Sequence, residues 1–301
     1  MDTDRLPKQC ERCLYERQAR RTEDQAYLSE VRQLLEARRP EDTAPYLAWK
    51  IQERWEARFG KAAGYAKEKR QYNDLVLSME GEIRRAIRHA PDPLARALAY
   101  ARSGNYIDFS ALSHVDPDTF LALLAASAFS REDERVFRHL VKDVEHAESF
   151  LLLADNCGEI VLDRLFLEVL HEQYPDLRLY VMVRGGEIVN DATLEDAIYA
   201  GVDRLATLLT NGAPLAGTVR SLLEEASAQI LEEADVILAK GQGNYESLWG
   251  EGLHIYYAFL CKCERFTQRF GVPALTGVLV EETGKRHDAL LPVGRSDTGR
   301  S

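Results

Sequence analysis

Four polar residues stand where a strand is expected to end and a loop to begin. Asp155 and Asn156 follow one apolar run, and Asp191 and Lys240 lie in Gly- and Asn-rich segments that follow two later runs. The runs are residues 150–154, 177–183 and 236–239. Because ligands of open α/β sheets bind outside the carboxyl ends of the strands, we expect these four side chains to share one cleft.

The types of these residues favour metal-assisted phosphoryl chemistry. Two carboxylates and an amide oxygen can hold a divalent ion through hard oxygen ligands and leave positions for water and a substrate oxygen. Such an ion polarises a phosphoryl oxygen and lowers the pKa of bound water. Lys240, in a glycine-flanked loop, would place positive charge beside a phosphate. Positioning and charge neutralisation are most of what phosphoryl transfer requires.

Each segment alone also has a simpler interpretation. Asp155 and Asn156 could cap the helix that follows them. Asn190 and Asp191 could form a turn before the next helix, and residues 240–243 could be a plain strand-to-helix turn. Their joint position at one sheet edge is what favours a ligand site.

Composition and charge restrict the class of protein. The chain has 301 residues, 46% hydrophobic and 29% charged, as in ordinary globular proteins. Its formal net charge of −11 argues against nucleic acid as a partner and leaves a small phosphorylated metabolite open. We find no apolar run of about 18 residues, so no membrane association is expected. The N-terminus lacks the apolar core of a secretory signal, which predicts a cytoplasmic location.

The five cysteines are not the even set of a disulfide framework. Cys10 and Cys13 form a C-x-x-C in an Arg- and Glu-rich helical stretch, not after a strand as in thioredoxin-like motifs. Cys261 and Cys263 could complete a zinc site with them. Reduced cysteines without a catalytic role are the favoured interpretation.

Two parts of the chain differ in their patterning. Residues 9–145 carry apolar residues at helical spacing, whereas five apolar runs of strand length alternate with helical stretches from residue 150 onward. The runs are 150–154, 177–183, 204–209, 236–239 and 255–260. This order predicts an α/β fold, in which an N-terminal helical region precedes a doubly wound, mostly parallel sheet with helices on both faces. We divide the chain into a helical lid (1–145), an α/β core (146–284) and a polar tail (285–301).

Three ordered motifs resemble the damage-control phosphatase family, also labelled domain of unknown function 89. They are Asp155-Asn-Cys-Gly-Glu-Ile-Val-Leu-Asp163, Arg184-Gly-Gly-Glu-Ile-Val-Asn-Asp-Ala-Thr193 and Lys240-Gly-Gln-Gly-Asn-Tyr-Glu246. Gly104-Asn-Tyr-Ile-Asp108 and the Cys10-Glu-Arg-Cys13 of the family's prokaryotic-type branch are weaker matches. Together they span nearly the whole chain in the family's order.

The resemblance implies a phosphatase that uses a divalent metal ion (Mg²⁺, Mn²⁺, Co²⁺ or Ni²⁺) and acts on small phosphorylated metabolites, including sugar phosphates and damaged by-products. The family's metal ligands fall on Asp155, Asn156 and Asp191, and its phosphate-binding lysine falls on Lys240. We also expect roles in substrate or phosphate binding for Asn244, Arg184, Glu159 and Asn105. The family commonly has a small residue where Cys157 stands. The resemblance assigns no role to Cys10 and Cys13.

Alternative mechanisms and functions stay open at this point. Direct attack by water is preferred to an aspartyl-phosphate, because Cys157 stands where haloacid-dehalogenase-type phosphatases have a second Asp. An S-adenosylmethionine-dependent carboxyl methyltransferase, an activity also claimed for part of the family, is a rival function. A third is a non-catalytic metabolite-binding or redox module that needs Cys10 and Cys13 but not Asp155. Specificity is expected from the helical region, including Lys69, Asn73 and Asp108, and no oligomeric state is predicted.

Overall fold

Six strands form one sheet in the order β3-β2-β1-β4-β5-β6 within residues 6–61, 64–106 and 117–284, the part of the chain that this computed structural model describes. The strands are β1 (Ser149–Leu153), β2 (Arg178–Val183), β3 (Thr207–Thr210), β4 (Val236–Lys240), β5 (Ile255–Leu260) and β6 (Gly277–Glu282). β1 to β5 are parallel, and β6 pairs with β5 in the antiparallel direction. The predicted α/β fold with a mostly parallel sheet is confirmed.

The sequence prediction missed β6 and displaced β3. β6 ends in Glu281 and Glu282 and lies at the edge of the sheet, so it lacks the continuous apolar run that marks the central strands. In the run 204–209, residues Val202–Arg204 form a 3₁₀ turn, and the strand begins only at Thr207. The predicted tail 285–301, together with Asp108, lies outside the described residues.

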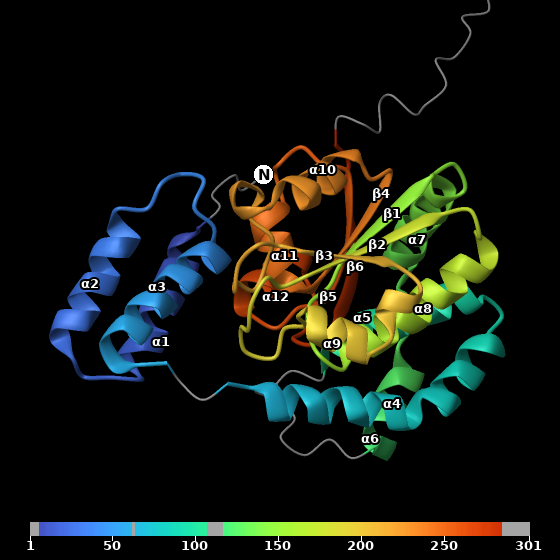
Figure 1. Ribbon diagram of the computed structural model, residues 1–301, viewed down its shortest axis with the longest axis horizontal. Helices are drawn as coiled ribbons and strands as arrows, with labels where there is room; N and C mark the ends of the chain where they lie inside the picture. The colour runs from blue at the N-terminus through green and yellow to red at the C-terminus, as the bar shows by residue number, and fades with distance from the viewer. Residues whose placement is uncertain (1–5, 62–63, 107–116, 285–301) are drawn as a thin grey trace, which may run out of the picture.

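Helices cover both faces of the sheet (Figure 1). On one face, Phe150 and Leu152 of β1 contribute to a core with helices that precede and follow the strand: α4 (Ala66–Arg88), α5 (Pro93–Ser103), α6 (Pro117–Ala126), α7 (Arg131–Val144), α8 (Glu159–Gln173) and α9 (Leu194–Tyr199). On the other face, Leu151 and Leu153 pack with α10 (Glu225–Glu233), α11 (Gly241–Leu248) and α12 (Glu264–Phe270). Alternate residues of β1 thus serve opposite cores.

The first helices have a core of their own. α1 (Lys8–Ala19), α2 (Gln25–Glu36) and α3 (Ala44–Phe59) bury Leu14, Val31 and Ile51 among themselves, and α3 contacts α11. Figure 1 shows these helices as a group beside the sheet, whereas α4 runs along it. The described helices before β1 therefore contribute to two cores, and the role of residues 1–145 as a lid stays a prediction.

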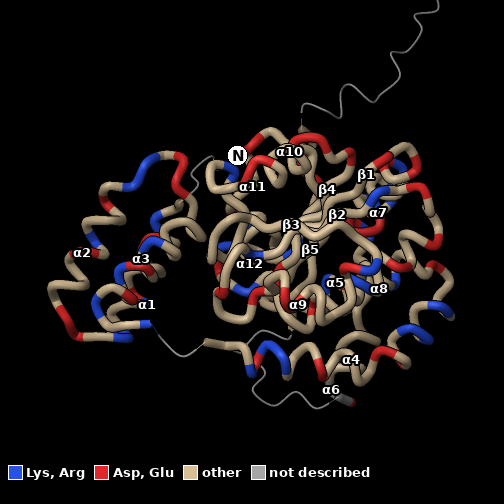
Figure 2. Tube along the Cα trace, in the orientation of Figure 1, with Lys and Arg blue, Asp and Glu red and all other residues tan. Residues whose placement is uncertain are grey.

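Charged residues are interspersed along the described helices. Figure 2 shows Lys and Arg alternating with Asp and Glu in α1 to α4, without a continuous basic stretch. None of the described helices combines the length and apolar character that a membrane span needs.

Candidate active site

The loops that follow β1 and β2 meet at the point where the chain reverses its direction across the sheet. β1 pairs with β2 on one side and with β4 on the other, so its carboxyl end is the switch point where ligands of such folds bind. Backbone contacts join the two loops there: the Ala192 N–H donates to the carbonyl of Asp155 at 2.8 Å, and an isolated bridge pairs Asn156 with Asp191. Two of the predicted metal-ligating segments are thus neighbours.

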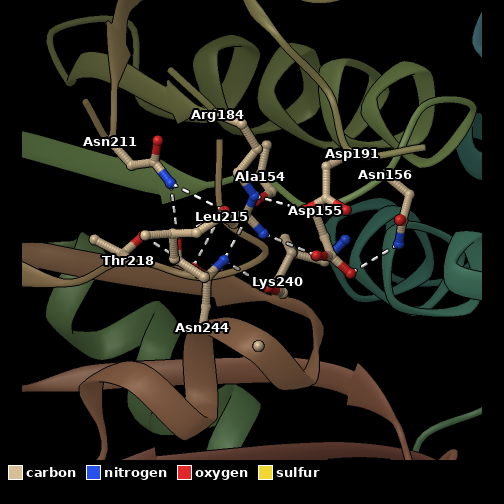
Figure 3. A network of polar contacts seen from close by, with 12 residues as sticks. Ala154, Asp155, Asn156, Arg184, Asp191, Asn211, Leu215, Thr218, Lys240 and Asn244 are labelled. Atoms are coloured by element: carbon tan, nitrogen blue, oxygen red, sulfur yellow. Dashed lines mark hydrogen bonds and ion pairs between the residues drawn. The ribbon is translucent and has the colours of Figure 1, made fainter. Parts of the chain in front are cut away.

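Arg184 lies between the two carboxylates of the site. Its Nε donates to Oδ2 of Asp191 at 2.6 Å, and its Nη2 donates to Oδ1 of Asp155 at 2.9 Å. Figure 3 shows this guanidinium between the carboxylates and Asn244, whose Oδ1 accepts from Nη1 at 3.1 Å. Because both carboxylates reach one guanidinium, they also converge closely enough to face a common cation.

Two side-chain amides orient Asp155 and Glu159. The amide nitrogen of Asn156 donates to Oδ2 of Asp155 (2.7 Å) and to Oε2 of Glu159 (3.2 Å). Asn105 Nδ2 makes the same two contacts at 2.9 and 2.8 Å. Since the Asn156 nitrogen donates to carboxylates, its carbonyl oxygen is the amide atom left to bind a metal ion.

Lys240 is not among the residues that line the cavity, and its expected role in phosphate binding stays a prediction. Its side chain is completely buried, and Nζ donates to Oε1 of Glu159 (2.6 Å), Oδ1 of Asp163 (2.7 Å) and the carbonyl of Ala101 (2.9 Å). These contacts use the three donors of an ammonium group. Burial alone would lower the pKa of Lys240, but Asp163 and Glu159 outweigh it and raise the pKa to about 12. Lys240 therefore neutralises acids beneath the site.

Burial raises the pKa of Asp155 to about 7, and the nearby Asp191 and Glu159 act in the same direction. Arg184 and Lys262 oppose this shift. Burial makes this carboxyl costly to ionise, and a cation bound beside it would stabilise the charged form. The donor set of Asp155, Asn156 and Asp191 fits a hard divalent ion in chemistry and charge.

Glycine is required next to Asp155. Gly241, the first residue of α11, has φ +77°, and a Cβ added there would lie 2.1 Å from Oδ2 of Asp155. The carboxylate consequently rests directly on the backbone of the loop after β4. In the same loop, Asn244 Nδ2 donates to the carbonyls of Lys240 (2.7 Å) and Ala154 (3.2 Å), which joins the ends of β4 and β1.

Two residues of helix α4 contact the loops that carry the site. Oδ1 of Asn73 accepts from the backbone N–H of Gly158 at 2.6 Å, next to the start of α8. Lys69 forms an ion pair with Asp196 at 2.5 Å. Both residues were expected to contribute to specificity, and the contacts that the structure gives them hold loops.

A cavity of about 550 Å³ opens above the site. Asn105, Asp155, Asn156 and Asp191 line its floor, whereas Arg184, Glu159, Lys240 and Asn244 are not among its lining residues. The opposite wall comes from α1, α3 and the segment around α12. The wall residues that the sequence reasoning missed include Gln242, Glu246, Lys262 and Arg265. They follow the ends of β4 and β5, which was the available signal.

The cysteines do not form a zinc site. All five are free thiols: Cys157 and Cys261 are buried, and Cys10, Cys13 and Cys263 line the cavity. Among the described residues, no three or more His, Cys, Asp or Glu side chains are grouped as metal ligands. A hard-ion site at Asp155 and Asp191 would thus depend on the Asn156 oxygen and on further ligands from water or substrate.

Known proteins resemble this chain in sequence. A family model described as the damage-control phosphatase ARMT1-like domain matches residues 1–276. A damage-control phosphatase of Archaeoglobus fulgidus is 30% identical over 233 residues, which cover 75% of this chain and 78% of that protein. A damage-control phosphatase of Pyrococcus horikoshii is 31% identical over 179 residues, covering 59% and 61%. An uncharacterized protein of Methanocaldococcus jannaschii is 34% identical over 187 residues. That match covers 60% of this chain and 60% of the archaeal protein, which is less than two thirds of its length.

A solved structure shares the fold. The crystal structure of a protein of the domain of unknown function 89 family from Pyrococcus horikoshii has a TM-score of 0.73 to this chain. The match covers 92% of this chain and 98% of that one at 23% sequence identity. At that identity the likeness concerns the fold.

Proposed function

Because this chain belongs to the damage-control phosphatase ARMT1-like domain family, as its motifs indicated, we propose that it is a divalent-metal-dependent phosphatase of small phosphorylated metabolites. The observation that carries the proposal is the convergence of the Asp155 and Asp191 carboxylates on one guanidinium at the switch point of the sheet. Sugar phosphates and damaged phosphometabolites are the substrate classes proposed. The expected cytoplasmic location stays a prediction.

The residues present divide the work of phosphomonoester hydrolysis among them. Asp155, Asn156 and Asp191 would hold the ion, which when bound supplies positive charge to the phosphate and acidifies water. Arg184 keeps the two carboxylates together, and Asn105 holds Oδ2 of Asp155 from the side of α5. Residues of α1 form the wall opposite the floor of the cavity, where the remote part of a substrate would lie.

Attack by water on phosphorus is favoured over attack by Asp155. Its Oδ1 accepts from Arg184, and its Oδ2 accepts from Asn105 and Asn156. A nucleophilic carboxylate needs an oxygen free to approach phosphorus in line, whereas a ligand gains from being fixed. Trapping an acyl-phosphate with hydroxylamine would overturn this assignment. Methyl transfer has no use for the paired carboxylates, and no contact among the described residues of the site favours it.

The proposal is tested by a screen of a phosphometabolite panel with Mg²⁺, Mn²⁺, Co²⁺, Ni²⁺ or EDTA. We expect turnover that depends on the metal ion and falls on the order of 100-fold or more in Asp155→Ala. Asp203→Ala, which removes an exposed carboxylate away from the cavity, is the matched control. Equal turnover in Asp155→Ala, or in EDTA, would exclude the proposed function.

A further inference from the structure

One side of α11 presents an amide and a carboxyl group to the cavity. Gln242 and Glu246 are four residues apart, so they project from the same face of the helix, and both line the cavity. Gln242 follows Gly241, the residue on whose backbone the carboxylate of Asp155 rests. Glu246 lies about 6 Å further along the helix axis than Gln242. A molecule with its phosphate above Asp155 would therefore meet Glu246 with its other end.

Glu246 has a carboxylate oxygen that no described residue uses. Its side chain is 16% exposed, and Oε1 accepts from Nη1 of Arg265 at 3.3 Å. Within the described part of the chain, Oε2 accepts from no donor, and it is not among the atoms closed off from solvent. Since the acceptors of a mostly buried carboxylate are normally filled, a bound molecule is the expected donor to Oε2.

Arg265 fixes Glu246 and balances its charge. The Arg265 side chain is 14% exposed, and its Nη1 also donates to Sγ of Cys10 at 3.5 Å. The ion pair thus joins α11 and α12 to α1 across this wall. One carboxylate and one guanidinium leave no net charge here, so the position favours a neutral polar group of a ligand over a charged one.

A hydroxyl group suits this pair better than an amine or a second phosphate. A phosphate oxygen would meet the like charge of Glu246, and an ammonium group would meet that of Arg265. Burial raises the pKa of the Glu246 carboxyl to about 7, so both of its protonation states occur near neutral pH. A hydroxyl can bind to either state, because it donates one hydrogen bond and also accepts.

We propose that Glu246 determines substrate specificity by accepting a hydrogen bond from a hydroxyl group of a polyhydroxylated phosphomonoester. This inference rests on the proposed function and narrows it. The substrate carries its phosphate at the Asp155 end of the cavity and a hydroxyl group beside α11, and it carries no second phosphate at that position.

The test compares wild type, Glu246→Ala and Glu246→Gln on substrates with and without hydroxyl groups. With Mn²⁺ present, kcat and KM are measured for ribose 5-phosphate, glucose 6-phosphate and p-nitrophenyl phosphate. We expect Glu246→Ala to lower kcat/KM for the sugar phosphates on the order of 10- to 100-fold, mainly through KM, because a hydrogen bond to a charged group is lost. The value for p-nitrophenyl phosphate should stay within about twofold. Glu246→Gln keeps an acceptor and should lose less than Glu246→Ala.

The controls separate a contact with substrate from a structural role. Glu145→Ala, at an exposed position at the end of α7, is the matched control and should leave all three values as in wild type. An equal loss on all three substrates in Glu246→Ala, or no loss on any, would overturn the inference. Glucosamine 6-phosphate and fructose 1,6-bisphosphate test the other ligand groups. A loss confined to either of them would assign this wall to an ammonium group or a second phosphate and would also overturn the inference.

The outcomes also separate this inference from the proposed function. Turnover of p-nitrophenyl phosphate by a wild type that neither hydrolyses nor binds the sugar phosphates would reject the inference alone. If the wild type hydrolyses no phosphomonoester, calorimetry in the presence of Mn²⁺ decides. Weaker binding of glucose 6-phosphate in Glu246→Ala, with unchanged binding of inorganic phosphate, would keep the inference and reject the proposed function. Equal binding of glucose 6-phosphate by the two proteins, or none by the wild type, would reject both.

Discussion

Nζ of Lys240 lies 2.6 Å from Oε1 of Glu159, and both side chains are completely buried. The other oxygen of Glu159 accepts from Asn105 and Asn156, which also hold Asp155. A continuous set of charge-assisted hydrogen bonds thus runs from the interior of the sheet to the candidate metal ligands. Lys240 is connected to the chemistry through the position of Glu159.

We predict that Lys240→Met mainly destabilises the fold. It would leave Glu159 and Asp163 buried without their cation, a change that costs about 3–5 kcal/mol. The free energy of unfolding from urea titrations measures the loss, and Lys142→Met on the surface should stay within about 0.5 kcal/mol of wild type. A Lys240→Met protein with wild-type stability and no phosphate affinity would instead place Lys240 at the phosphate, as the family resemblance implies.

Two glycines offer a matched test of the contact below Asp155. Gly241 and Gly252 have φ of +77° and +78°, but a Cβ at Gly252 would meet no atom within 4 Å, whereas at Gly241 it would meet the carboxylate of Asp155. Gly252→Ala should therefore cost only the backbone strain, about 1–2 kcal/mol, and keep its activity. Gly241→Ala should cost a further 1–3 kcal/mol, roughly, and lose metal-dependent turnover. Equal stability and turnover in the two variants would show that Asp155 does not depend on this contact.

The alternation of side chains along β4 could have predicted the face of the sheet to which the Lys240 side chain belongs. The sequence pattern ended the strand at Ala239, which left Lys240 in a loop that faces a ligand, but β4 extends to Lys240. Val236 and Leu238 face the core that contains α5 and α8, and Lys240 continues this alternation. A prediction that included Lys240 in the strand would therefore have placed its side chain on the face covered by α8, where it contacts Glu159 and Asp163.

The convergence of Asp155, Asn156 and Asp191 followed from a rule that needs little geometry. Side chains just beyond the carboxyl ends of parallel strands share one edge, so strand positions alone bring them together. Lys262 lies at the same edge, but Cys261 and Lys262 do not form a Gly- or Asp-rich motif. The wall that α1 contributes could not be inferred either, because it depends on how α3 packs on α11.

The thiols on the cavity wall allow the redox alternative to be tested. Cys10 and Cys13 line the cavity but lie on α1, and neither is among the side chains that hold Asp155. We predict that Cys10→Ser/Cys13→Ser keeps phosphatase turnover within about twofold of wild type, since serine is a close replacement in shape and at position 10 can still accept from Arg265. Turnover is compared with and without dithiothreitol. A requirement for both cysteines, together with an active Asp155→Ala, would favour the redox module.

Glu246, on the same wall, predicts how stability depends on pH. Burial raises the pKa of its carboxyl to about 7, although the ion pair with Arg265 acts in the opposite direction. Between pH 4.5, the ordinary pKa of a glutamate, and about pH 7, the folded state holds a proton that the unfolded state has released. The contribution of this carboxyl to the free energy of unfolding is therefore fully present at acidic pH, and it is lost as the pH rises toward 7.

Glu246→Gln should remove this pH dependence. Between pH 5 and pH 8, the free energy of unfolding of the variant should rise by up to about 3 kcal/mol relative to wild type. The loss of the ion pair with Arg265 would reduce this gain. Urea titrations at pH 5, 6, 7 and 8 measure the difference, and Glu145→Gln at an exposed position is the control. Parallel curves of unfolding free energy against pH for Glu246→Gln and wild type would contradict this prediction. They would mean that the Glu246 carboxyl is ionised from pH 5 to pH 8 and that its ion pair with Arg265 offsets the cost of burial.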